Sequence, residues 1–463
     1  MVAPSQSPVD RESPFGLDEL FFSTTDRKGI IRSGNRVFAR VSGYREADLL
    51  GQPHNIIRHP DMPRAVFKLL WDYLEAGKPI AAYVKNMAKD GSYYWVVATV
   101  ACISGGYLSV RFKPSGPLFH PVQDLYRQLR EIERPFDEAG DRKAGIAAST
   151  QHLLSSLTAL GFADYDAFMT AMLPTELRSR ALKVGEPKRE IPPGKSRGPA
   201  LERLLGDCSE IETFLTGLFG QIGDLGALQT NLEESSAFVL SLASEIRLTS
   251  RNASVAALRL EDAGKTLGVI ASIMAQHSEE TARLIKGLSG RIQNTSVTSR
   301  DVAFRVAAAK LQVEMATSFG RELGEHAVAA HTVSASIMAL VETLSDGVKN
   351  AFSACEQLHR ELTGLSSTLD ELNKLLRTLN VVHITGKVEA ARASTATTFD
   401  ALFATIASEL DRAHVTMHRF GRSISEISAR SRSWVDARDG ITKLLSDVSR
   451  TCRDIDADVT RAA

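Results

Sequence analysis

The spacing of apolar residues changes near residue 115 and divides the chain into two kinds of structure. Before that point, aromatic and β-branched runs at 93–100 and 107–112 alternate with glycine-bearing turns at Asp90-Gly91 and Gly105-Gly106. Short apolar runs between such turns are typical of antiparallel strands joined as hairpins. The first part of the chain is therefore predicted to have an α+β fold.

Helical spacing follows over residues 115–183. Leucine and isoleucine recur there at intervals of three and four, and one segment ends at Gly161. This spacing predicts a small helical connector. Residues 184–199 combine proline, glycine and charge without any period. Such a composition predicts a flexible linker.

From residue 200 to residue 463 the apolar stripes are long and regular, and no proline occurs after residue 200. Apolar residues hold intervals of three, four or seven in two runs: Ile211, Leu215, Leu218, Ile222, Leu225, Leu232, Val239, Leu242 and Ile246, then Leu362, Leu365, Leu369, Leu372, Leu376 and Leu379. Helix propensity alone stabilises such segments too little, so the stripes must be buried against partner helices. We expect an all-α region folded as a long antiparallel four-helix bundle or coiled coil.

The helical region also contains an internal repeat. NASVAALR at 252–259 precedes LGVIASIM at 267–274, and TGKVEAAR at 385–392 precedes FATIASEL at 403–410. In each copy a helical stripe meets a small or polar break, near 260–266 and near 393–402, and then resumes. Two helical hairpins in one chain supply four long helices.

Both copies resemble the cytoplasmic hairpin tip of chemoreceptors, the methyl-accepting chemotaxis proteins. That family forms its four-helix tip from two chains, so the resemblance implies a monomeric pseudo-dimer, with a homodimer as the alternative. Tip residues of the family contact a chemotaxis histidine kinase and its coupling protein, and Arg259, Glu389 and Arg392 match such positions. In the first copy, Ala256 stands where the family has a glutamate, so this tip is degenerate. A different signalling protein is therefore an equally open candidate for the partner.

Six short motifs lie in order across residues 17–114. They are Ser23-Thr-Thr-Asp26, Val41-Ser-Gly-Tyr44, Gly51-Gln-Pro-His-Asn55, Arg58-His-Pro-Asp-Met-Pro63, Val84-Lys-Asn86, and Gly91 followed by Tyr94-Trp-Val96. Together they resemble the PAS domain of aerotaxis receptors. The resemblance implies a five-stranded antiparallel sheet with short helices on one side, and a pocket for FAD.

The same resemblance supplies candidate cofactor residues. Arg58 and His59 match positions implicated in flavin binding, and Asp61 is expected to shape their loop. The other candidates are Asn86 for the ring edge, Trp71 as a ring wall, and His54 and Asn35. Each has a structural alternative, because the histidines can bond loop backbone and Trp71 can belong to the core.

One position departs from the aerotaxis pattern. Ile80 follows the turn at Gly77-Lys78-Pro79, where those receptors carry a tryptophan. The loss of an aromatic wall leaves three alternatives to FAD: haem, another ligand, or an empty pocket.

Composition narrows the remaining possibilities. Lys plus Arg and Asp plus Glu both total 55, so no bulk field attracts nucleic acid. No run approaches the roughly 20 apolar residues of a membrane span, and no secretory leader is recognisable. Four cysteines stand apart without metal-ligand spacing. We expect a bacterial protein that stays in the cytoplasm.

These observations favour a non-enzymatic signal transducer for energy taxis, sensing redox state or oxygen through the PAS domain. The enzymatic rival is a histidine kinase with His383 as phosphoacceptor, but no glycine-rich nucleotide lid follows it, and a solvent-facing histidine explains His383 better. His414 and His418 have metal-ligand spacing without a glutamate between them. A third class is a scaffold or decoy that binds chemotaxis or polarity proteins.

Overall fold

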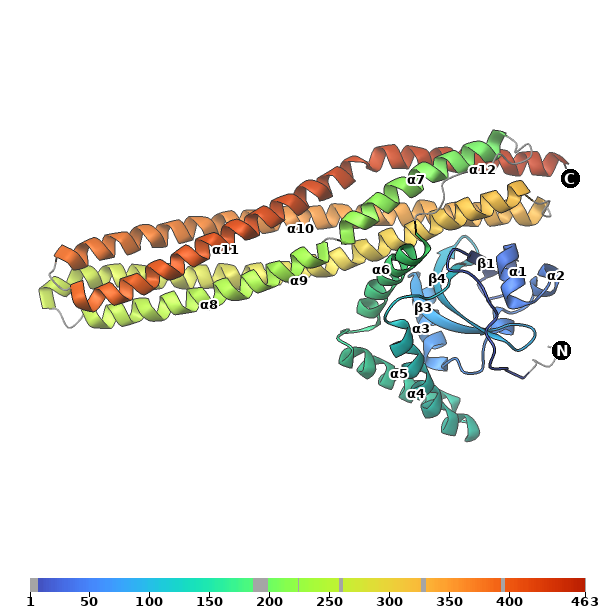
Figure 1. Ribbon diagram of the computed structural model, residues 1–463, viewed down its shortest axis with the longest axis horizontal. Helices are drawn as coiled ribbons and strands as arrows, with labels where there is room; N and C mark the ends of the chain where they lie inside the picture. Colours follow the sequence, from blue (N-terminus) through green and yellow to red (C-terminus); the bar gives the residue numbers. More distant parts are fainter. Residues whose placement is uncertain are drawn as a thin grey trace. The chain divides into compact units, whose positions relative to one another are not determined.

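The computed structural model describes residues 7–185, 199–223, 225–257, 261–325, 330–392 and 396–462 (Figure 1). The chain divides into two compact units. One comprises residues 1–219, 303–351 and 438–463, and the other comprises 220–302 and 352–437.

The first unit contains a five-stranded antiparallel sheet, as predicted. Its strands are β1 (Leu20–Asp26), β2 (Ile31–Gly34), β3 (Ile80–Met87), β4 (Tyr93–Ile103) and β5 (Gly106–Phe112), in the order β2-β1-β5-β4-β3. Gly91 and Gly105 adopt positive φ angles of 85° and 91° at the two hairpin turns. Glycine adopts this conformation without the steric cost that a Cβ would bring. The predicted α+β fold and its hairpins are therefore confirmed.

Short helices fill the connection between β2 and β3. They are α1 (Arg36–Ser42), α2 (Glu46–Leu49), the 3-10 turn η1 (His54–Ile57) and α3 (Arg64–Glu75). Strand register assigns the sheet residues to two faces, because residues paired across strands share a face. We call the face toward α3 the inner face and the opposite one the outer face. Ser23 pairs with Ser109 and Phe21 with Arg111 on the inner face, whereas Phe22 pairs with Val110 on the outer face.

Three helices follow the sheet: α4 (Phe119–Glu138), α5 (Arg142–Ala159) and α6 (Tyr165–Val184). Helices α4 and α6 cover its outer face. Tyr126 of α4 donates its hydroxyl proton to the Tyr83 carbonyl at 3.0 Å, and Tyr165 of α6 donates to the Ala81 carbonyl at 3.0 Å. Phe22 is fully buried and meets the ring of Phe319 edge to face, with 5.0 Å between centroids. Both faces of the sheet are thus buried.

Long helices make up the rest of the described chain: α7 (Pro199–Gly223), α8 (Leu225–Ala257), α9 (Glu261–Glu325), α10 (Ala330–Arg392), α11 (Ala396–Asp436) and α12 (Arg438–Ala462). In the second unit, parts of α8, α9, α10 and α11 run side by side (Figure 1). The predicted stripe on α10 is buried: Leu362, Leu365, Leu369, Leu372, Leu376 and Leu379 are each at most 3% exposed. The prediction of a long all-α region is confirmed.

Helix ends fall close to both predicted tips. Residues 258–260 and 393–395 lie outside the described residues, whereas 261–266 and 396–402 are already helical in α9 and α11. The candidate Arg259 and most of the predicted linker at 184–199 also lie outside the described residues. The expectation that His383 faces solvent is wrong. Its side chain is 5% exposed, because it continues the buried stripe one turn beyond Leu379.

Glu176 on α6 anchors the segment through which the chain leaves the sheet. Its side chain is 1% exposed and accepts hydrogen bonds from the backbone N–H groups of Ser115 (2.7 Å) and Gly116 (2.8 Å) and from the Tyr83 hydroxyl. Burial and the adjacent Glu176 carboxylate raise the pKa of Tyr83, so that hydroxyl remains a donor.

Both backbone N–H groups donate to Oε2, and the Tyr83 hydroxyl donates to Oε1. Glu176→Gln is expected to lower the free energy of unfolding by about 1–3 kcal/mol, because an amide nitrogen in place of Oε1 cannot accept from the Tyr83 hydroxyl. Urea unfolding followed by tryptophan fluorescence measures the change. Glu138→Gln, at an exposed position on α4, is the control and should leave the transition unchanged. Identical transitions for the two variants would contradict the anchoring role.

Candidate ligand pocket

A cavity of about 280 Å³ lies between the inner face of the sheet and helix α3. Phe67, Leu70, Trp71 and Leu74 form its helical wall. Their intervals of three and four place them on one side of α3. Val84, Ala98 and Val100 add apolar surface from the strands. Such a lining suits a flat, largely apolar group.

The polar end of the pocket is built around Arg111. This side chain is 3% exposed, and its Nη2 lies 2.9 Å from the Ser23 hydroxyl oxygen and 2.6 Å from His54 Nε2. A guanidinium can only donate, so His54 Nε2 must accept, and the ring proton lies on Nδ1. Desolvation, with the positive charge of Arg111, lowers the pKa of His54 to about 3. His54 is therefore neutral at pH 7.

Among the described residues, no carboxylate pairs with Arg111, which remains a cation. Burial lowers its pKa to about 10, which still leaves it protonated at neutral pH. The guanidinium carbon lies 5.4 Å from the centroid of Phe38 and 5.9 Å from that of Phe21. These ring faces partly offset the cost of burying the charge.

Within the described residues, three buried polar atoms of the pocket lining lack a hydrogen-bond partner: Arg111 Nη1, Asn86 Nδ2 and Ser109 Oγ. Nearly all buried polar groups in folded proteins are paired. Three unpaired atoms around one cavity indicate that this wall suits a ligand with hydrogen-bond acceptors.

Four of the predicted site residues come together at the pocket: His54, Arg58, Trp71 and Asn86. Arg58 lies 4.0 Å from the Phe67 ring centroid and donates to the Met62 carbonyl at 3.2 Å. Burial, with Arg64 nearby, lowers the pKa of Arg58 to about 10. Trp71 is 37% exposed, so it belongs to the pocket rim rather than to the core.

The other three predicted residues, Asn35, His59 and Asp61, do not line this pocket. Asn35 is the N-cap of α1, where its Oδ1 accepts from the N–H groups of Phe38 and Phe22. Its Nδ2 also donates to the Leu20 carbonyl. This arrangement fastens α1 to β1.

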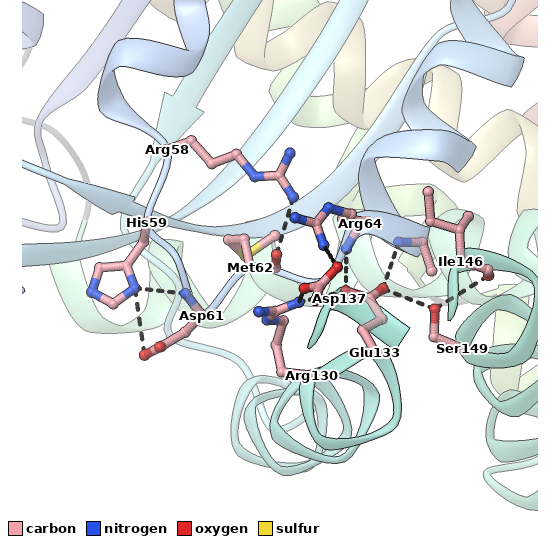
Figure 2. A network of polar contacts seen from close by, with 11 residues as sticks. Arg58, His59, Asp61, Met62, Arg64, Arg130, Glu133, Asp137, Ile146 and Ser149 are labelled. Carbon is pink, nitrogen blue, oxygen red and sulfur yellow. Dashed lines mark hydrogen bonds and ion pairs between the residues drawn. The ribbon is translucent and has the colours of Figure 1, made fainter. Parts of the chain in front are cut away.

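His59 and Asp61 shape the loop that leads into α3. His59 is 2% exposed, and its Nδ1 accepts from the Asp61 N–H at 3.1 Å (Figure 2). Burial, with the positive charge of Lys85, lowers the pKa of His59 to about 4. Asp61 forms an ion pair with Lys85 at 2.7 Å. The loop role that sequence reasoning gave to Asp61 agrees with this position.

Sequence reasoning missed Arg111, Ser23 and Ser109 as pocket residues. A signal was present in β5, where Leu108, Val110 and Phe112 alternate with Ser109 and Arg111. Alternation predicts that the polar residues share one face of the strand. Only the register with β1 and the covering helix show that this face is buried and lines a cavity.

A second polar network lies beneath α3 (Figure 2). The Glu133 carboxylate of α4 accepts from the N–H groups of Arg64 and Ala65, from Ser149 Oγ of α5 and from Arg130. Asp137 pairs with both Arg64 and Arg130. The network joins the start of the pocket helix to two helices of the connector.

Comparisons with known proteins agree with the fold of this domain. Residues 32–107 match the family model described as the PAS fold. The chain is 39% identical over 126 residues to the aerotaxis receptor of Escherichia coli (strain K12), which covers 26% of this chain and 25% of that protein. It is 32% identical over 74 residues to a nitrogen fixation regulatory protein of Klebsiella pneumoniae, covering 16% and 15%. The chain thus spans a quarter or less of these relatives.

Solved structures that part of the chain matches include that of a light-oxygen-voltage domain from a flavin-analogue study and the light state of the blue-light photoreceptor Aureochrome1 LOV. The first is 21% identical with a TM-score of 0.22 and covers 23% of this chain and 85% of that chain. The second is 25% identical with a TM-score of 0.19 and covers 20% and 79%. The N-terminal domain is a PAS domain similar to that of the aerotaxis receptor.

No group of three or more His, Cys, Asp or Glu side chains in the described part of the chain is placed to hold a metal ion. No helix among the described residues is both long enough and apolar enough to cross a membrane.

The low pKa of His54 predicts a pH dependence of stability. A folded pKa near 3 lies below the unfolded value of about 6.5, so acid favours the unfolded state and stability falls as pH drops through this window. From pH 7 to pH 5, His54 should contribute a loss of about 2 kcal/mol. His54→Gln keeps an acceptor for Arg111 but cannot titrate.

Urea unfolding at the two pH values measures this difference. The His54→Gln variant should lose less stability than the parent on acidification, and His120→Gln, at an exposed position on α4, should behave like the parent. Equal acid sensitivity of the parent and His54→Gln would show that His54 is not held neutral by its neighbours.

Proposed function

We propose that the protein is a flavin-binding PAS sensor that signals through its helical region. The main support is the polar wall of the pocket, where Arg111 Nη1 and Asn86 Nδ2 are buried donors that find no acceptor among the residues the structure describes. The opposite wall is the apolar side of α3. Hydrogen-bond donors on one wall and a flat apolar surface on the other suit the isoalloxazine ring, which has carbonyl acceptors at one edge and flat apolar faces.

Flavin, when bound, supplies redox chemistry that can report on oxygen or respiratory state. Arg111 and Asn86 would donate to the carbonyl edge of the ring, and Phe67 and Trp71 would contact its faces. Arg58 would hold an anionic phosphate at the mouth of the pocket. FAD is the form implied by the resemblance to aerotaxis receptors, and the similarity to one such receptor over 126 residues supports it.

Haem is less well supported by the pocket. The predicted haem alternative needs a histidine with a free ring nitrogen for iron. His54 Nε2, the nitrogen nearest the polar wall, is engaged with Arg111 at 2.6 Å. An iron atom there would have to displace a buried guanidinium.

The proposed output is protein binding rather than catalysis. Glu389 and Arg392 form an ion pair at 2.9 Å near the end of α10, and the Arg392 side chain is 73% exposed. This pair remains available to a partner, for which we propose a chemotaxis kinase, its coupling protein or another signalling protein. The buried position of His383 makes it a poor phosphoacceptor, which favours a non-enzymatic role.

Purified protein tests the flavin proposal directly. It should show the two visible absorption bands of oxidised flavin, and Arg111→Met should bind FAD at least about tenfold more weakly, because hydrogen bonds to charged groups contribute about 1.5–3 kcal/mol. Lys113→Met, one residue beyond β5 and away from the pocket lining, is the matched control. A Soret band, the absence of FAD binding, or full binding by Arg111→Met would contradict the proposal.

A further inference from the structure

Helix α3 begins without a cap of its own. Its N-cap residue is Pro63, which makes no capping side-chain hydrogen bond. The first N–H groups of any helix have no acceptor within the helix and need one from elsewhere. Here the acceptor comes from α4, because Glu133 Oε2 lies 2.9 Å from the Arg64 nitrogen and Oε1 lies 3.0 Å from the Ala65 nitrogen.

The same carboxylate also holds the connector helices. Ser149 Oγ of α5 donates to Glu133 Oε1 at 2.8 Å, and Arg130 of α4 donates to Oε2 at 2.8 Å. Glu133 is 1% exposed. Its two oxygens therefore accept from four donors on three helices, and Figure 2 labels three of the donor residues, Arg64, Arg130 and Ser149. A buried charge with this many partners is costly to disturb, since any lost bond leaves a buried group unpaired.

The helix held by Glu133 is also the wall of the pocket. Phe67 lies one turn after the capped N-terminus and contacts both the cavity and the guanidinium of Arg58. Displacement of α3 by an occupant of the pocket would pull on the Arg64 and Ala65 N–H groups. Through one carboxylate, that displacement reaches α4 and α5.

We propose that Glu133 is the positioning residue that couples the pocket wall to the α4–α5 pair. With Glu133 in place, α3, α4 and α5 move as one body. Without it, the Arg64–Asp137 ion pair still joins α3 to α4, but the first N–H groups of α3 lose their acceptor, so α3 can shift with a smaller effect on α4 and α5. The inference deepens the proposed function, because it names the route by which pocket occupancy leaves the PAS domain.

A double-mutant cycle on the full chain, prepared without flavin, tests this coupling. Phe67→Ala perturbs the pocket wall, and Glu133→Gln removes the acceptor for two of the four donors, because an amide nitrogen cannot accept. Hydrogen exchange of the amides in 119–159 is the measurement. Phe67→Ala alone should speed exchange there by about fivefold, the effect of losing a helix-capping interaction.

In the Glu133→Gln background, Phe67→Ala should produce a smaller change in 119–159 than it does in the parent. A residue that merely stabilised the fold would instead give additive effects. Glu131→Gln, at an exposed position on the same helix, should leave the Phe67→Ala effect intact. Phe67→Leu provides a milder perturbation if the alanine variant fails to fold, and it should show the same pattern.

Two results would overturn the inference. In the first, the Phe67 substitutions speed amide exchange in 119–159 equally with and without Glu133. In the second, they leave exchange in 119–159 unchanged in both backgrounds. Both readings use protein without flavin, so they are independent of the absorbance test. Failure to bind FAD would contradict the proposal that FAD is the ligand. Additive effects in the double-mutant cycle would contradict the proposal that Glu133 couples α3 to α4 and α5.

Discussion

The PAS domain depends on a buried cation, Arg111, that pairs with no carboxylate in the described part of the chain. Its Nη2 is bonded to Ser23 and His54, while its Nη1 has no hydrogen-bond partner among the same residues. A buried, unsatisfied donor costs about 1–3 kcal/mol, and more when it is charged. The fold bears this cost on the wall of a cavity, where a ligand with acceptor atoms can recover it. Strained or unsatisfied groups of this kind concentrate at functional sites.

Two buried glutamates connect the sheet domain to the helices that follow it. Glu133 satisfies the start of α3, and Glu176 satisfies the backbone where the chain leaves β5. Each carboxylate belongs to a connector helix but bonds groups of the PAS domain. The PAS domain and α4–α6 are therefore fastened by polar contacts as well as by apolar packing. This arrangement favours transmission through helices that are directly bonded to the pocket wall.

The regular parts of the structure could be predicted from the sequence because they follow from local periodicity. The runs at 93–100 and 107–112 became β4 and β5, and the stripe at 362–379 is buried on α10. Glycine marked the hairpin turns for a steric reason. These features need only the pattern of neighbours along the chain.

The polar interior could not be predicted in the same way. Arg111, Glu133 and Glu176 resemble solvated surface charges in the sequence, and only tertiary pairing reveals that they are buried. Asn35 looked like a cofactor residue, but its side chain is the cap of α1. His383 was expected to face solvent, yet it continues an apolar stripe. For the three charged residues the deciding fact is a partner far away in the sequence, whereas the roles of Asn35 and His383 follow from residues three and four positions away.

The central claim is that Arg111 is the residue that meets the ligand. Nuclear magnetic resonance of labelled arginine side chains during a titration of the purified protein with FAD tests it most directly. The account predicts that the Arg111 guanidinium signal shifts as FAD binds, while that of Arg180, which is paired with Glu314 at 2.6 Å, stays in place. An Arg111 signal that does not move in protein saturated with FAD would contradict the account.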